Sequence, residues 1–326
     1  MEDVLGDWVP KVRDMVVALA AFGLVIALLL LFVERGPKSV REKVQVAIFA
    51  GPALFLLAIG LVYPAVRTTF RSLFGQENNF IGVENYQWIF EDPVARRSVI
   101  NTILWVVLTP LVATAIGLAY AIIIDRTKFE SLAKSLVFMP MAISFVGAGI
   151  IWRFVYAFRG QRGSEQIGLA NQFLVWFGQE PRRFLNEAPW NTLFLIIVMV
   201  WIQTGFATVV LSASIKNIPA EITEAATLDG ATRWQLFRNV TVPGIRPALV
   251  VVLTTISIGV LKVFDIVRTM TGGQTDSSVV ALEMYNQSFR YGEQGRGAAM
   301  AVLIFLLVVP LVVYNIRQMA RNREIR

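Results

Sequence analysis

The sequence predicts an all-α membrane protein with about seven transmembrane helices. Hydrophobic residues make up 56% of the 326 residues, and the mean hydropathy is +0.60. Only 16% of the residues are charged, whereas a typical soluble domain has about 25%. The charged residues also gather in short blocks between long apolar runs. This alternation is typical of a polytopic helical membrane protein.

Seven apolar runs approach the length of about 20 residues that a membrane-spanning helix needs. In chain order they are 15–33, 46–66, 99–124, 135–158, 189–215, 247–268 and 297–316. The sixth has the shortest charge-free core, 247–261, so a buried or interfacial helix is the alternative there. We interpret it as spanning, because without this span the loops rich in Lys and Arg would not all lie on the same side of the membrane.

The placement of Lys and Arg predicts the orientation. Half of the 30 Lys and Arg residues lie in four segments, 34–45, 125–134, 216–246 and 317–326. The positive-inside rule places such segments in the cytoplasm, so we expect a cytoplasmic C-terminus and an external N-terminus. The first ten residues are acidic, and no small-residue cleavage site follows the first run, so the first helix is expected to be an uncleaved anchor.

Three longer loops are expected outside. The loop 67–98 carries the aromatic stretch "FIGVENYQWIFEDP", which is expected to lie at the membrane interface. The loop 159–188 follows the fourth span. The third, 271–296, begins with "TGGQTDSS", which predicts a flexible turn.

The composition also excludes several chemistries. The chain has no Cys, hence no disulfide or thiolate chemistry. It has no His, which removes the commonest general base and metal ligand. We therefore expect no catalytic residues and no metal site. The net charge of +7 suits loops beside anionic lipid, and no basic stripe indicates nucleic-acid binding.

A polar stretch, "EAATLDGATRWQLFRNVTVP" (224–243), lies between the fifth and sixth runs. Together with the residues just before it, this stretch predicts a short helix that begins at Pro219, where the missing N–H of proline costs nothing. Glu221 and Glu224 complement the N-terminal dipole of this helix. Asp229 and Gly230 end it, because Gly adopts the left-handed conformation of a C-terminal cap.

A second short helix is predicted directly after Gly230. Thr232 and Gln235 have the spacing of a capping box. An apolar face recurs every third residue, at Trp234, Phe237 and Val240. Pro243 is expected to end this helix. The stretch is thus predicted to form two short cytoplasmic helices at an angle.

The same stretch resembles the signature loop of ABC importer permeases. The residues that match are Glu224-Ala225-Ala226, Gly230 and Val240-x-Val242-Pro243. The family usually has Ile and Leu where this chain has the two valines. An ordinary amphipathic cytoplasmic loop is the alternative interpretation.

The resemblance extends over roughly residues 45–320, through "NTILWVVL", "LVFMPMAISFVGAGIIWRFVY", "IGVLKVFDIVRTMTGG" and "GRGAAMAVLIF". These segments are similar to carbohydrate-uptake permeases of the larger, maltose type (MalF-like). The resemblance implies an anchor helix and basic loop over 1–45. It implies a permease domain over 46–326, with the coupling loop at about 216–247.

The resemblance also implies partners. Such a permease pairs with a second permease, two ATPase subunits and an external sugar-binding protein, in the cytoplasmic membrane of a bacterium or archaeon. The chain has no G-x-x-x-x-G-K-[ST] phosphate loop, so ATP and Mg are expected on the ATPase subunits and no cofactor on this chain. The residues expected to couple to the ATPase are Glu221, Glu224, Ala225, Ala226, Asp229, Gly230, Trp234, Phe237 and Pro243.

Charged residues inside predicted spans are candidates for the translocation path. Lys262, Asp265 and Arg268 are three residues apart, which predicts one charged face on the sixth helix. The alternative is mutual neutralisation near the outer interface. Arg153 either contacts the solute or extends to the interface.

Sugar recognition usually combines aromatic faces with hydrogen-bonding side chains. The candidates within the spans are Asn101, Trp105, Ser144, Trp152, Trp201, Gln203 and Thr204. For each, the alternative is an interfacial aromatic belt or a bond between helices.

Three functions are compatible with parts of this sequence. The first is a sugar importer permease without catalytic residues. The second is a permease of the same family with another cargo, such as glycerol phosphate. The third is a self-contained secondary transporter or membrane enzyme. It is disfavoured because Asp265 is the only carboxylate well inside a predicted span.

Overall fold

The computed structural model describes residues 12–17, 20, 23–24, 49–125, 127–160 and 165–324. In these residues the fold is helical, and its only extended pairing is an isolated bridge between Phe74 and Phe80. This confirms the all-α prediction. The chain divides into two compact units, Met1–Arg67 and Thr68–Arg326. The predicted anchor helix, 15–33, lies mostly outside the described residues.

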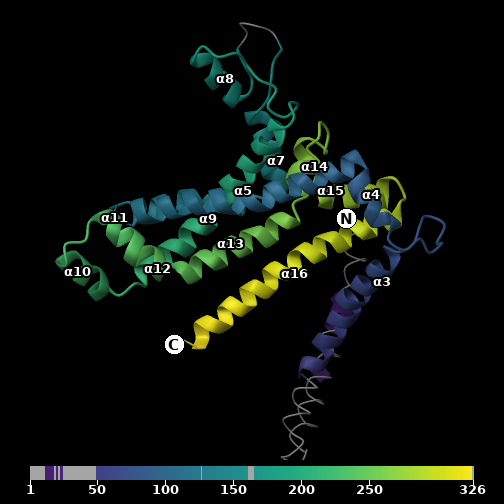
Figure 1. Ribbon diagram of the computed structural model, residues 1–326, viewed down its shortest axis with the longest axis horizontal. Helices are drawn as coiled ribbons and strands as arrows, with labels where there is room; N and C mark the ends of the chain where they lie inside the picture. The colour runs from purple at the N-terminus through teal and green to yellow at the C-terminus, as the bar shows by residue number, and fades with distance from the viewer. Residues whose placement is uncertain are drawn as a thin grey trace, which may run out of the picture. The chain divides into compact units, whose positions relative to one another are not determined.

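The described helices are numbered as in Figure 1. They are η1 (Ala58–Val62), α3 (Tyr63–Arg71), α4 (Glu84–Glu91), α5 (Pro93–Ile124), α6 (Glu130–Phe138), η2 (Met139–Ala142), α7 (Phe145–Val155), α8 (Leu169–Trp176), α9 (Trp190–Lys216), α10 (Ala220–Leu228), α11 (Arg233–Leu236), η3 (Phe237–Thr241), α12 (Val242–Gly244), α13 (Arg246–Leu261), α14 (Asp265–Met270), α15 (Val280–Tyr285), η4 (Asn286–Arg290) and α16 (Gln294–Glu324).

Four helices of the described chain are long and apolar enough to cross a membrane. They are Phe49–Arg71, Pro93–Ile124, Trp190–Lys216 and Gln294–Arg317. Two bent helix pairs add one span each if the pair crosses as a unit, so the described residues provide up to six. These segments correspond to the second to seventh predicted spans. The first predicted span is the anchor helix.

The core of the second unit lies where α5, α9 and α13 pack together. α5 lies along α9, and α13 packs against α5 and α16. Gly117 of α5 faces Ala207 of α9 so closely that a Cβ on Gly117 would lie 2.6 Å from the Ala207 Cβ. Small residues at such a crossing let two backbones approach, which is how membrane helices gain packing energy. The same core contains the buried side chains of Trp105, Leu195 and Ile256.

The fourth predicted span is not one continuous helix. The segment Glu130–Ala142 meets α7 at an angle of 102°. Pro140 lies in the 3₁₀ turn η2, and the Ser144 side chain caps α7 by accepting from the Gly147 N–H at 3.1 Å. A proline and a serine N-cap four residues apart end one helix and begin another.

The prediction of one charged face on the sixth helix is wrong. α13 ends at Leu261, Lys262 is its C-cap, and Asp265 begins the separate helix α14. The intervening Phe264 has φ −135° and ψ −54°, outside the helical region. The helix stops where its charge-free core stops, so Lys262 and Arg268 do not share a helix face.

Two π-helical turns lie immediately before prolines. The Tyr63 N–H bonds to the Ala58 O before Pro64, and the Val242 N–H bonds to the Phe237 O before Pro243. A widened turn gives the pyrrolidine ring room against the preceding turn, where a regular helix would clash. The prediction that Pro243 ends the second short helix is therefore wrong. The helix continues to Gly244 and then bends by 66° into α13.

Candidate functional site

The predicted two-helix loop is present, and its first helix ends in a complete Schellman cap. Gly230 has φ +81°. Its N–H bonds to the Thr227 O at 3.1 Å, and the Ala231 N–H bonds to the Ala226 O at 3.0 Å. These two bonds satisfy the last carbonyls of α10. Pro219 lies one residue earlier than predicted, as the N-cap of α10.

The second short helix begins with the predicted capping box. The Gln235 N–H donates to Thr232 Oγ1 at 3.3 Å, and the Thr232 N–H donates to Gln235 Oε1 at 2.8 Å. The rings of Trp234 and Phe237 pack 5.4 Å apart on the apolar face that the spacing predicted. Both ends of the turn between the helices are thus fixed by local bonds, so α10 and α11 are held at a defined angle.

The loop lies at one end of the helix bundle (Figure 1). It exposes large apolar side chains: Leu228 is 88% exposed, Trp234 66% and Ile222 51%. None of the α10 residues is buried, and the acidic Glu221 and Glu224 lie beside the apolar ones. Contiguous exposed apolar side chains with a polar rim mark an interaction surface. We call these residues, 219–244, the docking loop.

The coupling residues expected from the sequence all lie in the docking loop. Those exposed are Glu221, Glu224, Ala225, Asp229, Gly230, Trp234 and Pro243, while Ala226 and Phe237 are half-buried. The side chains of Glu221 and Glu224 are therefore accessible to a partner chain.

An ionic cluster fixes the base of the docking loop. Lys134 Nζ lies 2.6 Å from Asp125 Oδ1 and 2.7 Å from Glu130 Oε1. Lys216 also pairs with Glu130, and Ser212 Oγ donates to Asp125 Oδ1 at 2.6 Å. The cluster joins the ends of α5 and α9 and the start of α6 at the residues from which the docking loop departs.

Sequence reasoning missed this cluster. The signal available was the Glu130–Lys134 pair at i, i+4 in a segment expected on the same side as the loop. A hydrogen bond from Lys134 to Ser212 also joins residues that are 78 positions apart, which no local pattern indicates.

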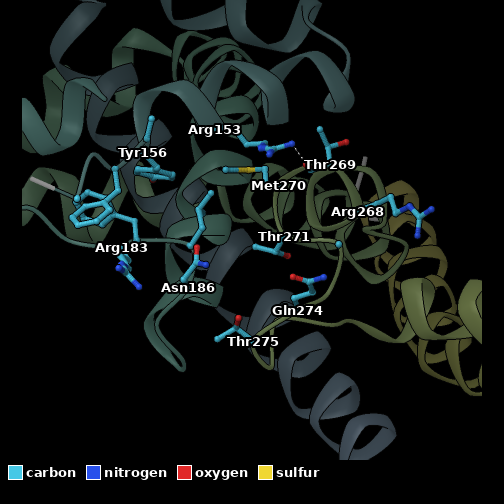
Figure 2. Close-up of a pocket in the computed structure, with 16 residues that line it drawn as sticks. Arg153, Tyr156, Arg183, Asn186, Arg268, Thr269, Met270, Thr271, Gln274 and Thr275 are labelled. Carbon is cyan, nitrogen blue, oxygen red and sulfur yellow. Dashed lines mark hydrogen bonds between the residues drawn. The ribbon is translucent and has the colours of Figure 1, made fainter. Parts of the chain in front are cut away.

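A second candidate site is a cavity of about 810 Å³ at the other end of the bundle. We call it the outer cavity (Figure 2). The end of α7, the segment 183–186, α14 and the loop after α14 form its walls. The polar lining residues are Arg153, Tyr156, Arg183, Asn186, Arg268, Thr269, Thr271, Gln274 and Thr275. None of the described residues that line it is Asp or Glu.

The three arginines of the outer cavity have partners in the protein. The Arg183 guanidinium lies 5.2 Å from the centre of the Phe158 ring, and that of Arg268 lies 5.3 Å from the Tyr285 ring. Arg153 Nη1 donates to the Thr269 O at 3.3 Å. Cation–π contacts of this kind hold a guanidinium against the ring.

The loop after α14, where a flexible turn was predicted, is held by hydrogen bonds from two spanning helices. Asn191 of α9 donates to the Thr275 O at 2.6 Å. Asn101 of α5 donates to the Asp276 O at 2.6 Å and to the Ser278 O at 2.8 Å. The Val280 N–H donates to Thr102 Oγ1 at 3.0 Å. The backbone that carries Gln274 and Thr275 is therefore fixed relative to α5 and α9.

The other predicted path residues do not line the outer cavity. Trp105 is fully buried, and Thr204 donates to the Val200 O of its own helix at 2.7 Å. Gln203 Nε2 contacts Met199 Sδ at 3.8 Å. Lys262 and Asp265 lie on either side of the break after α13.

The aromatic candidates are the ones that the fold brings together. The Trp152 ring lies 5.6 Å from the Trp201 ring and 5.2 Å from the Tyr156 ring. Through Tyr156 this pair reaches the outer cavity. Roles of the predicted path residues in solute contact stay predictions.

In the described part of the chain, no group of three or more Asp or Glu side chains is arranged to hold a metal ion.

The chain matches a known protein family over nearly its whole length. The model of the binding-protein-dependent transport system inner membrane component matches residues 14–326. The match includes the segment in which the anchor helix was predicted.

Two curated relatives are similar over most of their length. One is the alpha-glucoside transport system permease protein AglF of Rhizobium meliloti, 47% identical over 87% of this chain and 84% of the relative. The other is the osmoprotective compounds uptake permease protein GgtC of Synechocystis, 44% identical over 85% of this chain and all of the relative.

Among solved structures, the fold is similar to that of a bacterial ABC transporter involved in the import of the acidic polysaccharide alginate. The TM-score is 0.73 at 22% identity, over 87% of this chain and 98% of the other. At this identity the likeness shows a shared fold.

Proposed function

Because the chain belongs to the family of binding-protein-dependent transport system inner membrane components, we propose that it is the permease subunit of an ATP-driven importer for a sugar or glycoside. It is a multi-pass membrane transport subunit rather than an enzyme. The observation that carries the sugar cargo is the 47% identity to a permease named for alpha-glucosides, over 87% of the chain.

The docking loop supports the proposed partners. An exposed apolar surface at the end of a helix bundle, beside two accessible glutamates, suits contact with another protein. We assign this contact to an ATPase subunit, which would hold ATP and Mg. The full assembly would contain a second permease, two ATPase subunits and an external sugar-binding protein.

The positions of the two sites support the proposed orientation. α9 begins beside the outer cavity, where Asn191 bonds to Thr275, and ends in the ionic cluster at Lys216. Its 27 residues span about 40 Å at 1.5 Å per residue, the full thickness of a bilayer. The outer cavity then faces outward and the docking loop and C-terminus face the cytoplasm. The N-terminus would lie outside.

The mechanism follows from how the docking loop is held. The Schellman cap and the capping box make α10 and α11 a stiff unit. The ionic cluster fastens the start of this unit to α5, α6 and α9. Movement of an ATPase subunit at the docking loop would therefore move α5, α6 and α9 together, which opens the path alternately to either side.

A second cargo class rests on one observation. The relative at 44% identity is named for osmoprotective compounds. Osmoprotective compounds are therefore the alternative cargo.

The test is the ATPase rate of the assembled complex. We expect maltose, trehalose or sucrose, together with the external binding protein, to raise the rate about tenfold, as expected when solute delivery triggers the cycle. The sugar alone and the binding protein alone serve as controls. If none of the sugars raised the rate and an osmoprotective solute did, the sugar assignment would be wrong.

A further inference from the structure

The outer cavity has the dimensions of a small-molecule site. Its volume of about 810 Å³ falls within the range of about 300–1,000 Å³ that ligand pockets occupy. It lies at the external end of the bundle, where a delivered solute would first meet this chain. The inference below therefore rests on the proposed function.

Two side-chain amides, from separate segments of the chain, line this cavity. Figure 2 shows Asn186 on one wall and Gln274 on the opposite wall, with Thr271 beside Gln274. Neither amide makes a hydrogen bond to another described residue, and both side chains are exposed. An amide presents both a donor and an acceptor, which matches the hydroxyl groups of a polyol or sugar.

The arginines of the cavity are held by contacts with other groups of the protein. The arginine side chains would attract an anion only through guanidinium groups directed into the cavity. Figure 2 shows Arg268 turned away from it, and both Arg268 and Arg183 lie against aromatic rings. Arg153 donates one of its five N–H groups to the Thr269 O, so it can also donate to a solute hydroxyl. The side-chain amides of Asn186 and Gln274 are neutral and make no hydrogen bond to another described residue.

The wall that carries Gln274 is preorganised. Asn191 and Asn101 hold the backbone at Thr275 and Asp276 from two different spanning helices. The opposite wall rests on the buried rings of Tyr156 and Phe184, whose centres lie 5.3 Å apart. Two fixed walls lower the entropic cost of binding.

We propose that the outer cavity is a receiving site for a neutral, polyhydroxylated solute, which the side-chain amides of Asn186 and Gln274 bind before the solute enters the helix bundle. Arg153 and Thr275 complete the polar wall. The aromatic residues behind the amides supply an apolar surface for the C–H groups of the solute.

The proposal is tested by direct solute binding to the purified permease–ATPase assembly without the binding protein. The probes are radiolabelled maltose, trehalose and sucrose, with glucuronate as an anionic competitor. We expect saturable binding of at least one sugar, and binding about tenfold weaker in the double variant Asn186→Ala, Gln274→Ala, because two hydrogen bonds are lost. Gln179→Ala, an exposed amide of the same external loop, is the matched control.

Each other outcome overturns the proposal. Absence of saturable sugar binding, equal binding by the double variant, or displacement by glucuronate at lower concentration than by the sugars would each do so. The ATPase assay with binding protein separates this from the proposed function. If sugars still raise the ATPase rate of the wild type, the importer assignment stands although the receiving site does not.

Discussion

Replacing Gly230 by valine is expected to abolish solute uptake while ATP hydrolysis continues. Gly230 has φ +81°, and a Cβ at this position would meet nothing within 4 Å. The substitution therefore acts through the backbone alone. A β-branched residue in the left-handed region costs about 1–3 kcal/mol, so the Schellman cap would open and the angle between α10 and α11 would change. The ratio of ATP hydrolysed to solute imported measures the effect.

Two variants serve as controls for Gly230→Val. Asn tolerates the left-handed region, so Gly230→Asn is expected to retain most uptake. Gly178, in the external loop, has φ +72° and equally open surroundings. Gly178→Val thus imposes the same strain far from the docking loop and should leave the ratio unchanged. Normal uptake by Gly230→Val would argue strongly against the role of the docking loop.

Replacing Gly117 by leucine is expected to prevent the core from packing. A Cβ on Gly117 would lie 2.6 Å from the Ala207 Cβ and 2.9 Å from the Thr208 N. Backbone atoms of α9 cannot move aside as a flexible side chain would, so α5 and α9 would have to separate. Overpacking typically costs about 1–3 kcal/mol, and a helix crossing this close should exceed that range. The yield of monodisperse protein and its melting temperature in detergent check the result.

The matched control is Gly259→Leu in α13, where an added Cβ meets nothing within 4 Å. This variant adds the same apolar volume to another spanning helix. Its melting temperature should stay close to that of the wild type. If the melting temperature of Gly117→Leu equalled that of the control, α5 and α9 would not pack as described.

The parts of the fold that depend on neighbouring residues were predictable from the sequence. The cap at Gly230 and the capping box at Thr232 involve residues within five positions of each other. Their geometry follows from residue type. The spans followed from apolar length in the same way.

The features that depend on distant residues were not predictable. Asn101 was a candidate for solute contact, and its bonds to Asp276 and Ser278 join residues 175 and 177 positions apart. The break after Leu261 was missed because spacing alone assumes a continuous helix. Pro243 was expected to end a helix, and the π turn that accommodates it has no sequence signature that we could use.

We propose that the docking loop contacts an ATPase subunit. The chain has no Cys, so a Leu228→Cys variant carries a single thiol, at a site that is 88% exposed in the wild type. Labelled with a benzophenone maleimide and illuminated in the assembled complex, it should yield an adduct with the mass of this chain plus one ATPase subunit. Phe289→Cys, at an exposed site of η4, should yield none. If Leu228→Cys gave no ATPase adduct, or if Phe289→Cys gave as much, the claim would be contradicted.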